Sequence, residues 1–157
     1  MSVKLDAYDR ALLAEIQRDA RLPQSELGER AHLSTAAVNR RLRLLSEAGV
    51  IEGYSARLNP KALGYGLTVI TEVMVENERS DLLDALQKSF NACPQVQQCY
   101  YVAGECDFVL VFLVRDMEQY VALTRALFQD SGNVKAFKTL VAMDRVKTGM
   151  GVPVEMG

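Results

Sequence analysis

In the first fifty residues, apolar side chains recur at spacings of three and four, which is the period of amphipathic helices packed on a core. The pattern predicts three helices: one capped by Asp6, a short one over about residues 24–31, and a third capped by Ser34. The apolar stripe of the third helix consists of Val38, Leu42 and Leu45. We expect this bundle, residues 1–50, to form an N-terminal domain.

The helical pattern breaks after residue 50. Glycine and proline interrupt the next stretch too often for a helix, at Gly53, Pro60, Gly64 and Gly66. We expect a brief strand over about residues 50–58 followed by a hinge. Residues 51–66 are therefore predicted to link two domains.

Beyond this linker, alternating and helical patterns follow one another. Strands are predicted over residues 67–75, 96–103, 108–114 and 134–143. One helix is expected to be capped by Ser80 and a second to start at Asp116. This βαββαβ order is typical of a ferredoxin-like α+β sandwich, with four antiparallel strands and two helices on one face. We expect it over residues 67–147, with residues 148–157 as a C-terminal tail.

The strand over residues 108–114 is apolar on both faces. One face carries Phe108, Leu110, Phe112 and Val114, and the other Val109, Val111 and Leu113. The helix starting at Asp116 is expected to carry on one side Met117, Tyr120, Val121, Thr124, Leu127 and Phe128. Because two helices cover only one face of a sheet, the other face implies a partner, most simply a second copy of the chain. We expect a homo-oligomer.

Composition narrows the class of protein. The chain has 157 residues, 49% hydrophobic and 24% charged, which is typical of a globular protein and not of a disordered one. No apolar run reaches the ~20 residues of a membrane span, and the first ten residues lack the apolar core of a signal peptide. The three cysteines, Cys93, Cys99 and Cys106, are expected to be reduced thiols, so a cytoplasmic location is predicted.

A formal net charge of −2 argues against nucleic acid as a partner, but the average hides an asymmetry. Residues 1–60 carry nine basic and eight acidic side chains, whereas residues 61–157 carry nine and twelve. Residues 31–46 contain Arg40, Arg41 and Arg43 and no acid. A short basic stripe on a nearly neutral chain is typical of a small element that binds nucleic acid.

A short helix, a turn and a basic helix opening with Ser-Thr form the pattern of a helix-turn-helix, whose second helix enters the major groove of DNA. The residues predicted to contact DNA are Ser34, Thr35, Ala36, Asn39, Arg40 and Arg43. Ser34, Thr35 and Asn39 could reach base edges, and the two arginines suit phosphates or guanine. Arg41 lies nearer the buried stripe and can equally brace the domain. The alternative interpretation is an ordinary three-helix bundle with a solvated basic face.

The chain resembles the Lrp/AsnC (feast/famine) transcriptional regulators over about residues 4–147. The motifs that carry the resemblance are Leu5-Asp6-x-x-Asp9, Asp19-x-Arg21, Leu33-Ser34, Arg40-Arg41, Gly49-Val50-Ile51 and, as a Gly-x-x-Asp-Phe/Tyr turn, Gly104 to Phe108. This resemblance implies a winged helix-turn-helix followed by an effector-sensing RAM domain. It also implies dimers formed through the sheets, octamers or similar rings, and binding of an amino acid or a related small molecule.

The same resemblance implies an effector site at this turn, formed by Tyr101, Val102, Ala103, Gly104 and Asp107. Gly104 permits a backbone to approach a small ligand, and the Asp107 carboxylate can accept from an α-ammonium group. A purely structural interpretation stays open, in which Gly104 makes the turn and Asp107 caps it.

No motif predicts catalysis, a cofactor or a metal ion. His32 is the only histidine, the cysteines lack paired spacing, and Gly64-Tyr65-Gly66 precedes a strand instead of a helix. We therefore expect a sequence-specific DNA-binding transcriptional regulator, not an enzyme, that responds to an amino acid or related small molecule. The alternative is an amino-acid-sensing regulatory subunit that docks on an enzyme through its helical domain.

Overall fold

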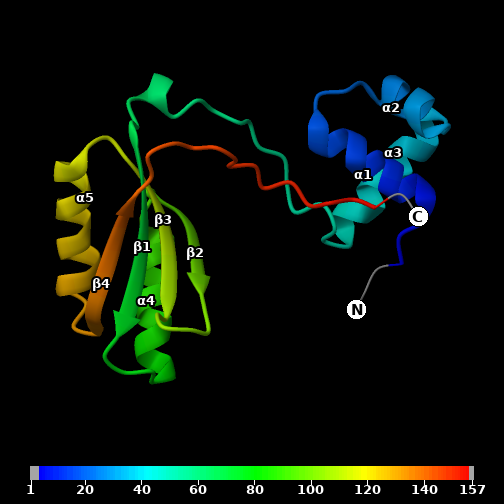
Figure 1. Ribbon diagram of the computed structural model, residues 1–157. Coiled ribbons are helices and arrows are strands. Elements are labelled where there is room, and N and C mark those ends of the chain that lie inside the picture. The colour runs from blue at the N-terminus through cyan, green and yellow to red at the C-terminus, as the bar shows by residue number, and fades with distance from the viewer. Residues whose placement is uncertain (1–3, 156–157) are drawn as a thin grey trace. The chain divides into compact units, whose positions relative to one another are not determined.

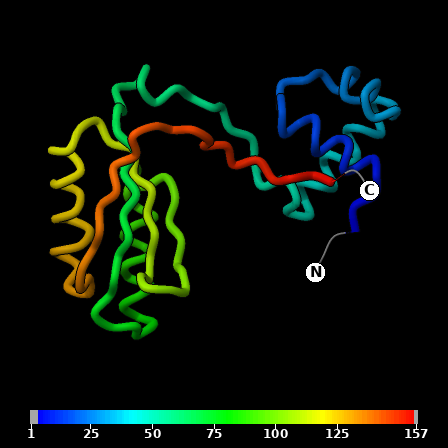
Figure 2. The backbone as a smooth tube through the Cα atoms, in the orientation of Figure 1, coloured from blue at the N-terminus to red at the C-terminus, as the bar shows by residue number. Residues whose placement is uncertain are grey.

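The computed structural model of the protein describes residues 4–155 (Figure 1). The chain divides into two compact units. One consists of the chain up to Arg57 together with the segment from Gly149 onward, and the other spans Leu58–Thr148. The backbone therefore passes between the units twice, after Arg57 and after Thr148 (Figure 2). In the part of the chain described, no helix combines the length and apolarity that a membrane span needs.

The first unit contains a bundle of α1 (Ala7–Arg18), α2 (Gln24–Ala31) and α3 (Thr35–Glu47). As predicted, Asp6 caps α1: its carboxylate accepts from the Asp9 N–H, and the Asp9 carboxylate accepts from the Asp6 N–H. The buried core of the bundle consists of Leu12, Ile16, Leu27, Ala31 and Val38. These side chains come from all three helices, so the core holds α3 against the other two.

The turn between α2 and α3 is tight. His32 follows α2 with φ at 54°, in the left-handed region that few residues other than glycine adopt. A Cβ on Gly28 would lie 2.5 Å from the Leu33 carbonyl oxygen, so only glycine fits there. Ser34 then caps α3 as predicted, its hydroxyl accepting from the Ala37 N–H at 3.2 Å. These contacts fix where α3 begins, which is the end predicted to meet DNA.

The strand predicted over residues 50–58 is wrong. The chain runs through residues 52–58 without a strand partner. A strand is stable only when neighbouring groups take up its backbone hydrogen bonds, and no strand of the described chain pairs with this stretch. Tyr54 and Leu58 remain 58% and 69% exposed. Their alternation with polar residues resembles the pattern of a strand, although the four strands of the described chain form a sheet without this stretch.

The second unit is the predicted sandwich of an antiparallel sheet and two helices. Its strands are β1 (Leu67–Val75), β2 (Val96–Tyr101), β3 (Phe108–Val114) and β4 (Val134–Val141). They lie in the order β2-β3-β1-β4. One 3-10 turn, η1 (Lys61–Leu63), precedes β1. The helices are α4 (Ser80–Ala92) and α5 (Met117–Thr124), and α5 continues as a π-helix, η2 (Arg125–Gln129) (Figure 1).

Three element ends differ from the prediction by one or two residues. Ser80 is the first residue of α4, and Arg79 occupies the N-cap position predicted for Ser80. The Arg79 N–H donates to the Asn77 side chain just before the helix begins. β2 ends at Tyr101, because the following residues turn toward β3. β4 ends at Val141, two residues before the predicted position.

The face of the sheet under the helices is an aromatic core. The Phe112 ring lies edge-on to Tyr120 and Phe128, with centroids 5.5 and 6.3 Å apart. The Tyr120 hydroxyl is 2.8 Å from the hydroxyls of both Thr71 and Thr139. This network satisfies buried polar groups and joins α5 to β1 and β4.

The structure corrects the predicted buried side of α5. Tyr120 and Phe128 face the sheet, but Met117 and Val121 are 42% and 44% exposed. The cause is η2, in which the N–H at position 130 donates to the Arg125 carbonyl five residues earlier. This wider turn adds a residue and rotates Phe128 away from the line of Met117 and Val121. A regular α-helix would have kept the three in line.

Within the second unit, Leu58–Thr148, no layer covers the opposite face of the sheet. Its partly exposed apolar residues are Ile70, Met74, Val109, Val111, Leu113 and Leu140. An ion pair between Glu72 and Lys138, at 3.6 Å, lies among them. As expected from its sequence, β3 is therefore apolar toward the helices and toward this open face.

The C-terminal segment is held by α1. The Gln17 side chain donates from Nε2 to the Val152 carbonyl and accepts at Oε1 from the Val152 N–H, both at 2.8 Å. One amide thus binds both backbone groups of a residue 135 positions away. The glycine-rich tail carries no sequence signal for this contact.

Candidate DNA-binding helix and effector turn

The exposed side of α3 brings the predicted DNA-contacting residues together. All six are exposed: Ser34, Thr35, Ala36, Asn39, Arg40 and Arg43. Arg40 makes no ion pair within residues 4–155, and Arg43 is 3.7 Å from Glu47, with both side chains mostly in solvent. Such exposed pairs are weak. Both guanidinium groups are therefore available to a phosphate or a base edge.

The sequence left two roles open for Arg41, a DNA contact or a contact that braces the domain, and its side chain makes the bracing contact. Its Nη1 donates to Asp6 at 2.8 Å and to Asp9 at 2.7 Å, and its guanidinium lies over the Tyr8 ring. The side chain is 19% exposed. The Asp9 N–H, and further Arg41, lower the pKa of the Asp6 carboxyl. Arg41 thus ties α3 to the start of α1.

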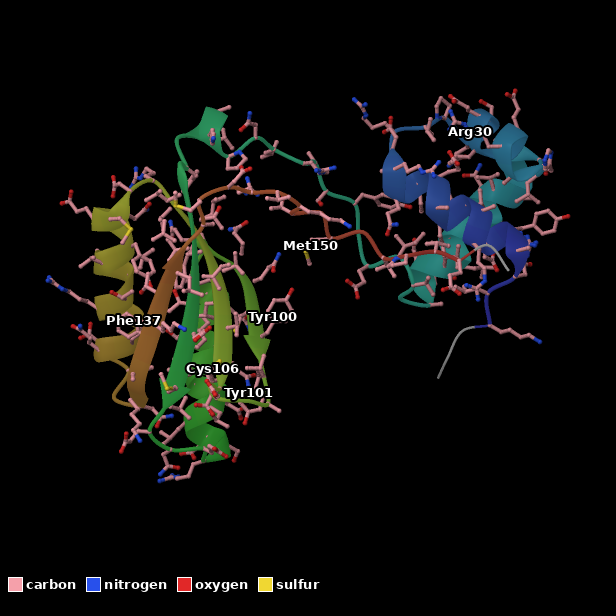
Figure 3. The ribbon with its side chains drawn as sticks, in the orientation of Figure 1. Arg30, Tyr100, Tyr101, Cys106, Phe137 and Met150 are labelled. Atoms are coloured by element: carbon pink, nitrogen blue, oxygen red, sulfur yellow. The ribbon has the colours of Figure 1, made fainter. Side chains whose placement is uncertain are left out.

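Other acids of the first unit are also paired within it. Arg30 on α2 (Figure 3) binds Glu15 at 2.7 Å and the neighbouring Glu26. Together with the Arg41 pairs, this gives four carboxylates an arginine partner away from the exposed side of α3. The exposed side of α3 keeps its positive charge, which favours an approaching phosphate backbone.

The predicted effector residues lie at one end of the second unit, where β2 leads into β3. Tyr101 and Cys106 mark the two sides of this turn in Figure 3. The Tyr101 side chain is 55% exposed and packs against Phe108, with ring centroids 5.1 Å apart. Val102 is half-buried, whereas Ala103 and Gly104 are exposed.

Gly104 is not required by the fold of the chain. Its φ lies outside the left-handed region, and a Cβ built on it would meet no atom within 4 Å. The turn itself therefore does not explain a glycine at this position. The absence of a side chain leaves room beside the Gly104 backbone, which a bound ligand can approach closely.

Asp107, in contrast, has a structural task. Its Oδ2 accepts from the Val75 N–H at 2.7 Å, its own N–H donates to the Val73 carbonyl, and its carbonyl accepts from the Val102 N–H. The residue caps the neighbouring strand β1 across the sheet, where β1 and β4 lose register. One carboxylate oxygen is thus committed to the fold.

Replacing Asp107 with alanine is expected to lower the free energy of unfolding of the second unit by about 1–3 kcal/mol, because the Val75 N–H loses its acceptor. Asp107→Asn keeps an acceptor oxygen and should lose less. Urea unfolding of both variants measures the difference. Equal stability of the alanine variant and the wild type would contradict the role of this bond.

The cysteines and the metal-binding side chains define no further site. Cys93, Cys99 and Cys106 are free thiols, and burial raises the pKa of the Cys99 thiol. Among the described residues, no three His, Cys, Asp or Glu side chains gather as a metal site would need.

Comparisons with known proteins agree with this two-part arrangement. Residues 5–52 match the family model for a winged helix-turn-helix DNA-binding domain, and residues 68–152 match the model for the Lrp/AsnC ligand binding domain. An HTH-type transcriptional regulator of Sinorhizobium fredii, y4tD, is 41% identical over 99% of this chain and 92% of its own. The leucine-responsive regulatory protein of Rhizobium meliloti is 34% identical over 97% of each chain.

The fold matches a solved structure as well. The crystal structure of a transcriptional regulator from Neisseria meningitidis in complex with L-Met superposes with a TM-score of 0.89, at 27% identity, over 96% of this chain and 97% of that one.

A helix-turn-helix followed by a ligand-binding sandwich defines a transcriptional regulator with a DNA-binding and a ligand-binding domain, not an enzyme. Within that class, the chain belongs to the Lrp/AsnC family. The matches give no support to the alternative of a subunit that docks on an enzyme.

Proposed function

We propose that two copies of the chain bind DNA through their α3 helices, and that an amino acid bound near residues 101–107 changes this binding. The single observation that carries the proposal is that one chain combines an exposed basic face on α3 with a ligand-binding domain of the Lrp/AsnC family. A regulator of this kind works in the cytoplasm, where it meets the DNA.

The open face of the sheet supports a dimer. Six apolar side chains lie there without a covering layer, and a second copy would bury them. Two-fold symmetry would then present two α3 helices to one DNA molecule. Half-sites one helical turn apart, about 34 Å, follow from that symmetry. Further assembly into octamers or similar rings is part of the proposal.

The chemistry of the turn supports an amino acid as the effector. Gly104 leaves open space, and the second carboxylate oxygen of Asp107 can accept from an α-ammonium group. A relative is named leucine-responsive, and the Neisseria regulator was solved with L-Met. Leucine and methionine are therefore the first ligands to test.

The effector would act by binding one assembly more tightly than another, because a ligand shifts an equilibrium only by its differential affinity. DNA affinity then follows the assembly, since several dimers grip one DNA stretch better than one. Gel shifts on the DNA upstream of the gene, with and without effector, would show discrete complexes that change in number or position.

Thermal-shift measurements against the twenty amino acids test the effector directly. A ligand at about 100 times its Kd is expected to stabilise the protein by about 2.7 kcal/mol. Gly104→Val should keep the melting midpoint of the free protein, because a Cβ at this position meets no atom within 4 Å, and should abolish the shift. A normal ligand response in this variant would place the effector elsewhere. If no amino acid shifts the wild type, the effector belongs to another class.

A further inference from the structure

The two helices that cover the sheet differ on their outward sides. The exposed side of α4 carries polar residues, namely Asp81, Asp84, Lys88 and Asn91. The exposed side of α5 lines a shallow depression and carries Met117, Glu118, Val121, Ala122 and Arg125, which we call the α5 outer face. A helix that is apolar on both sides is usually buried on both. The outer face of α5 is therefore built to meet another surface.

The charges on the α5 outer face have no partners within residues 4–155. Neither Glu118 nor Arg125 forms an ion pair there. Seven residues separate them, which places them on the same side of the helix about 10.5 Å apart along its axis. This distance is too long for the two to pair with each other. Two opposite charges thus flank an apolar centre formed by Val121 and Ala122.

We propose that the α5 outer face binds the same face of a second copy, with the two helices antiparallel about a two-fold axis. When that axis passes between Val121 and Ala122, Val121 of each copy faces Ala122 of the other. Glu118 of each copy then lies opposite Arg125 of the other, so the contact contains two symmetric ion pairs and both charges of each copy gain a partner. Self-complementarity of this kind is what a two-fold interface between identical chains requires.

This contact is distinct from pairing through the open face of the sheet, because α5 lies on the other side of the sheet. One short helix pair buries less than the roughly 1,000 Å² of a stable interface, so it holds weakly on its own. The α5 contact becomes stronger when each partner is already a dimer, because a dimer can form this contact at two places. A chain with two different two-fold interfaces assembles beyond a dimer.

Charge reversal tests the contact. Glu118→Arg or Arg125→Glu places like charges opposite each other, and we expect the mass of the largest assembly, measured by light scattering at about 0.1 mM, to fall at least twofold. The double variant Glu118→Arg with Arg125→Glu restores opposite charges across the axis and should recover the wild-type mass. This recovery separates a specific pairing from general damage to α5.

Lys88→Glu is the matched control, since it reverses a charge on the exposed side of α4, and it should leave the mass unchanged. The melting midpoint of every variant should equal that of the wild type. An unchanged mass in both single variants would overturn the proposal, as would a double variant that stays small. The failure of the sheet pairing would be distinguishable: the α5 contact alone would then give a weak, concentration-dependent dimer, and the single variants would be monomers at every concentration.

Discussion

Arg41→Ala is expected to lower the free energy of unfolding of the first unit by about 2–4 kcal/mol. The change removes both hydrogen bonds from Nη1 and the contact with the Tyr8 ring, and it leaves Asp9, only 14% exposed, without a counter-charge. The start of α1 then separates more easily from α3. Hydrogen exchange should rise in α1 and α3 and stay unchanged in the strands of the second unit.

The neighbouring Arg41→Lys provides the control. Lysine keeps the charge but lacks the planar fork and the stacking of a guanidinium, so its effect should lie between wild type and alanine. Both variants should bind DNA normally at temperatures where the unit stays folded. Loss of DNA binding in a fully folded Arg41→Ala protein would show instead that Arg41 contacts DNA.

The double variant Arg40→Ala with Arg43→Ala is expected to bind DNA on the order of a hundredfold more weakly at moderate salt, with no loss of stability. Both side chains are exposed and make no strong contact within the described residues. In a dimer, each arginine contributes two phosphate contacts. Each single replacement should therefore reduce the slope of log K against log salt concentration by about two units.

Arg18→Ala is the matched control for charge. Arg18 lies on α1, is 78% exposed and makes a weak contact with Glu15. It removes the same positive charge as each single α3 variant. If net charge alone determined binding, the control would flatten the salt dependence equally. Such a result would contradict α3 as the element that meets the phosphate backbone.

Local patterns predicted most of the elements because the forces that form them are local. The Asp6 capping box, the Ser34 cap and the alternation of β3 each depend on residues a few positions apart. The strand predicted over residues 50–58 failed for the complementary reason. A strand needs hydrogen-bond partners from elsewhere, and alternation alone does not supply them.

The site was predictable in part. Exposure of the α3 residues followed from helical periodicity, whereas the contact of Asp107 with Val75 joins positions 32 residues apart and has no sequence signal. The exposed Met117 and Val121 were mispredicted because η2 changes the helical period, and no residue in that stretch announces a π-helical turn. Both misses arise where tertiary structure, not local preference, decides.

The hydrogen bonds between Gln17 and Val152 also affect how an isolated DNA-binding fragment of the protein should be designed. A fragment that stops at Arg57 contains the whole helical bundle but lacks the C-terminal segment that Gln17 of α1 binds at Val152, so its Gln17 amide faces water. A DNA-binding fragment made from the N-terminal residues alone therefore loses the C-terminal segment that α1 binds. A fragment that keeps the native contacts of this unit would join residues 149–155 to residues 1–57 through a flexible linker.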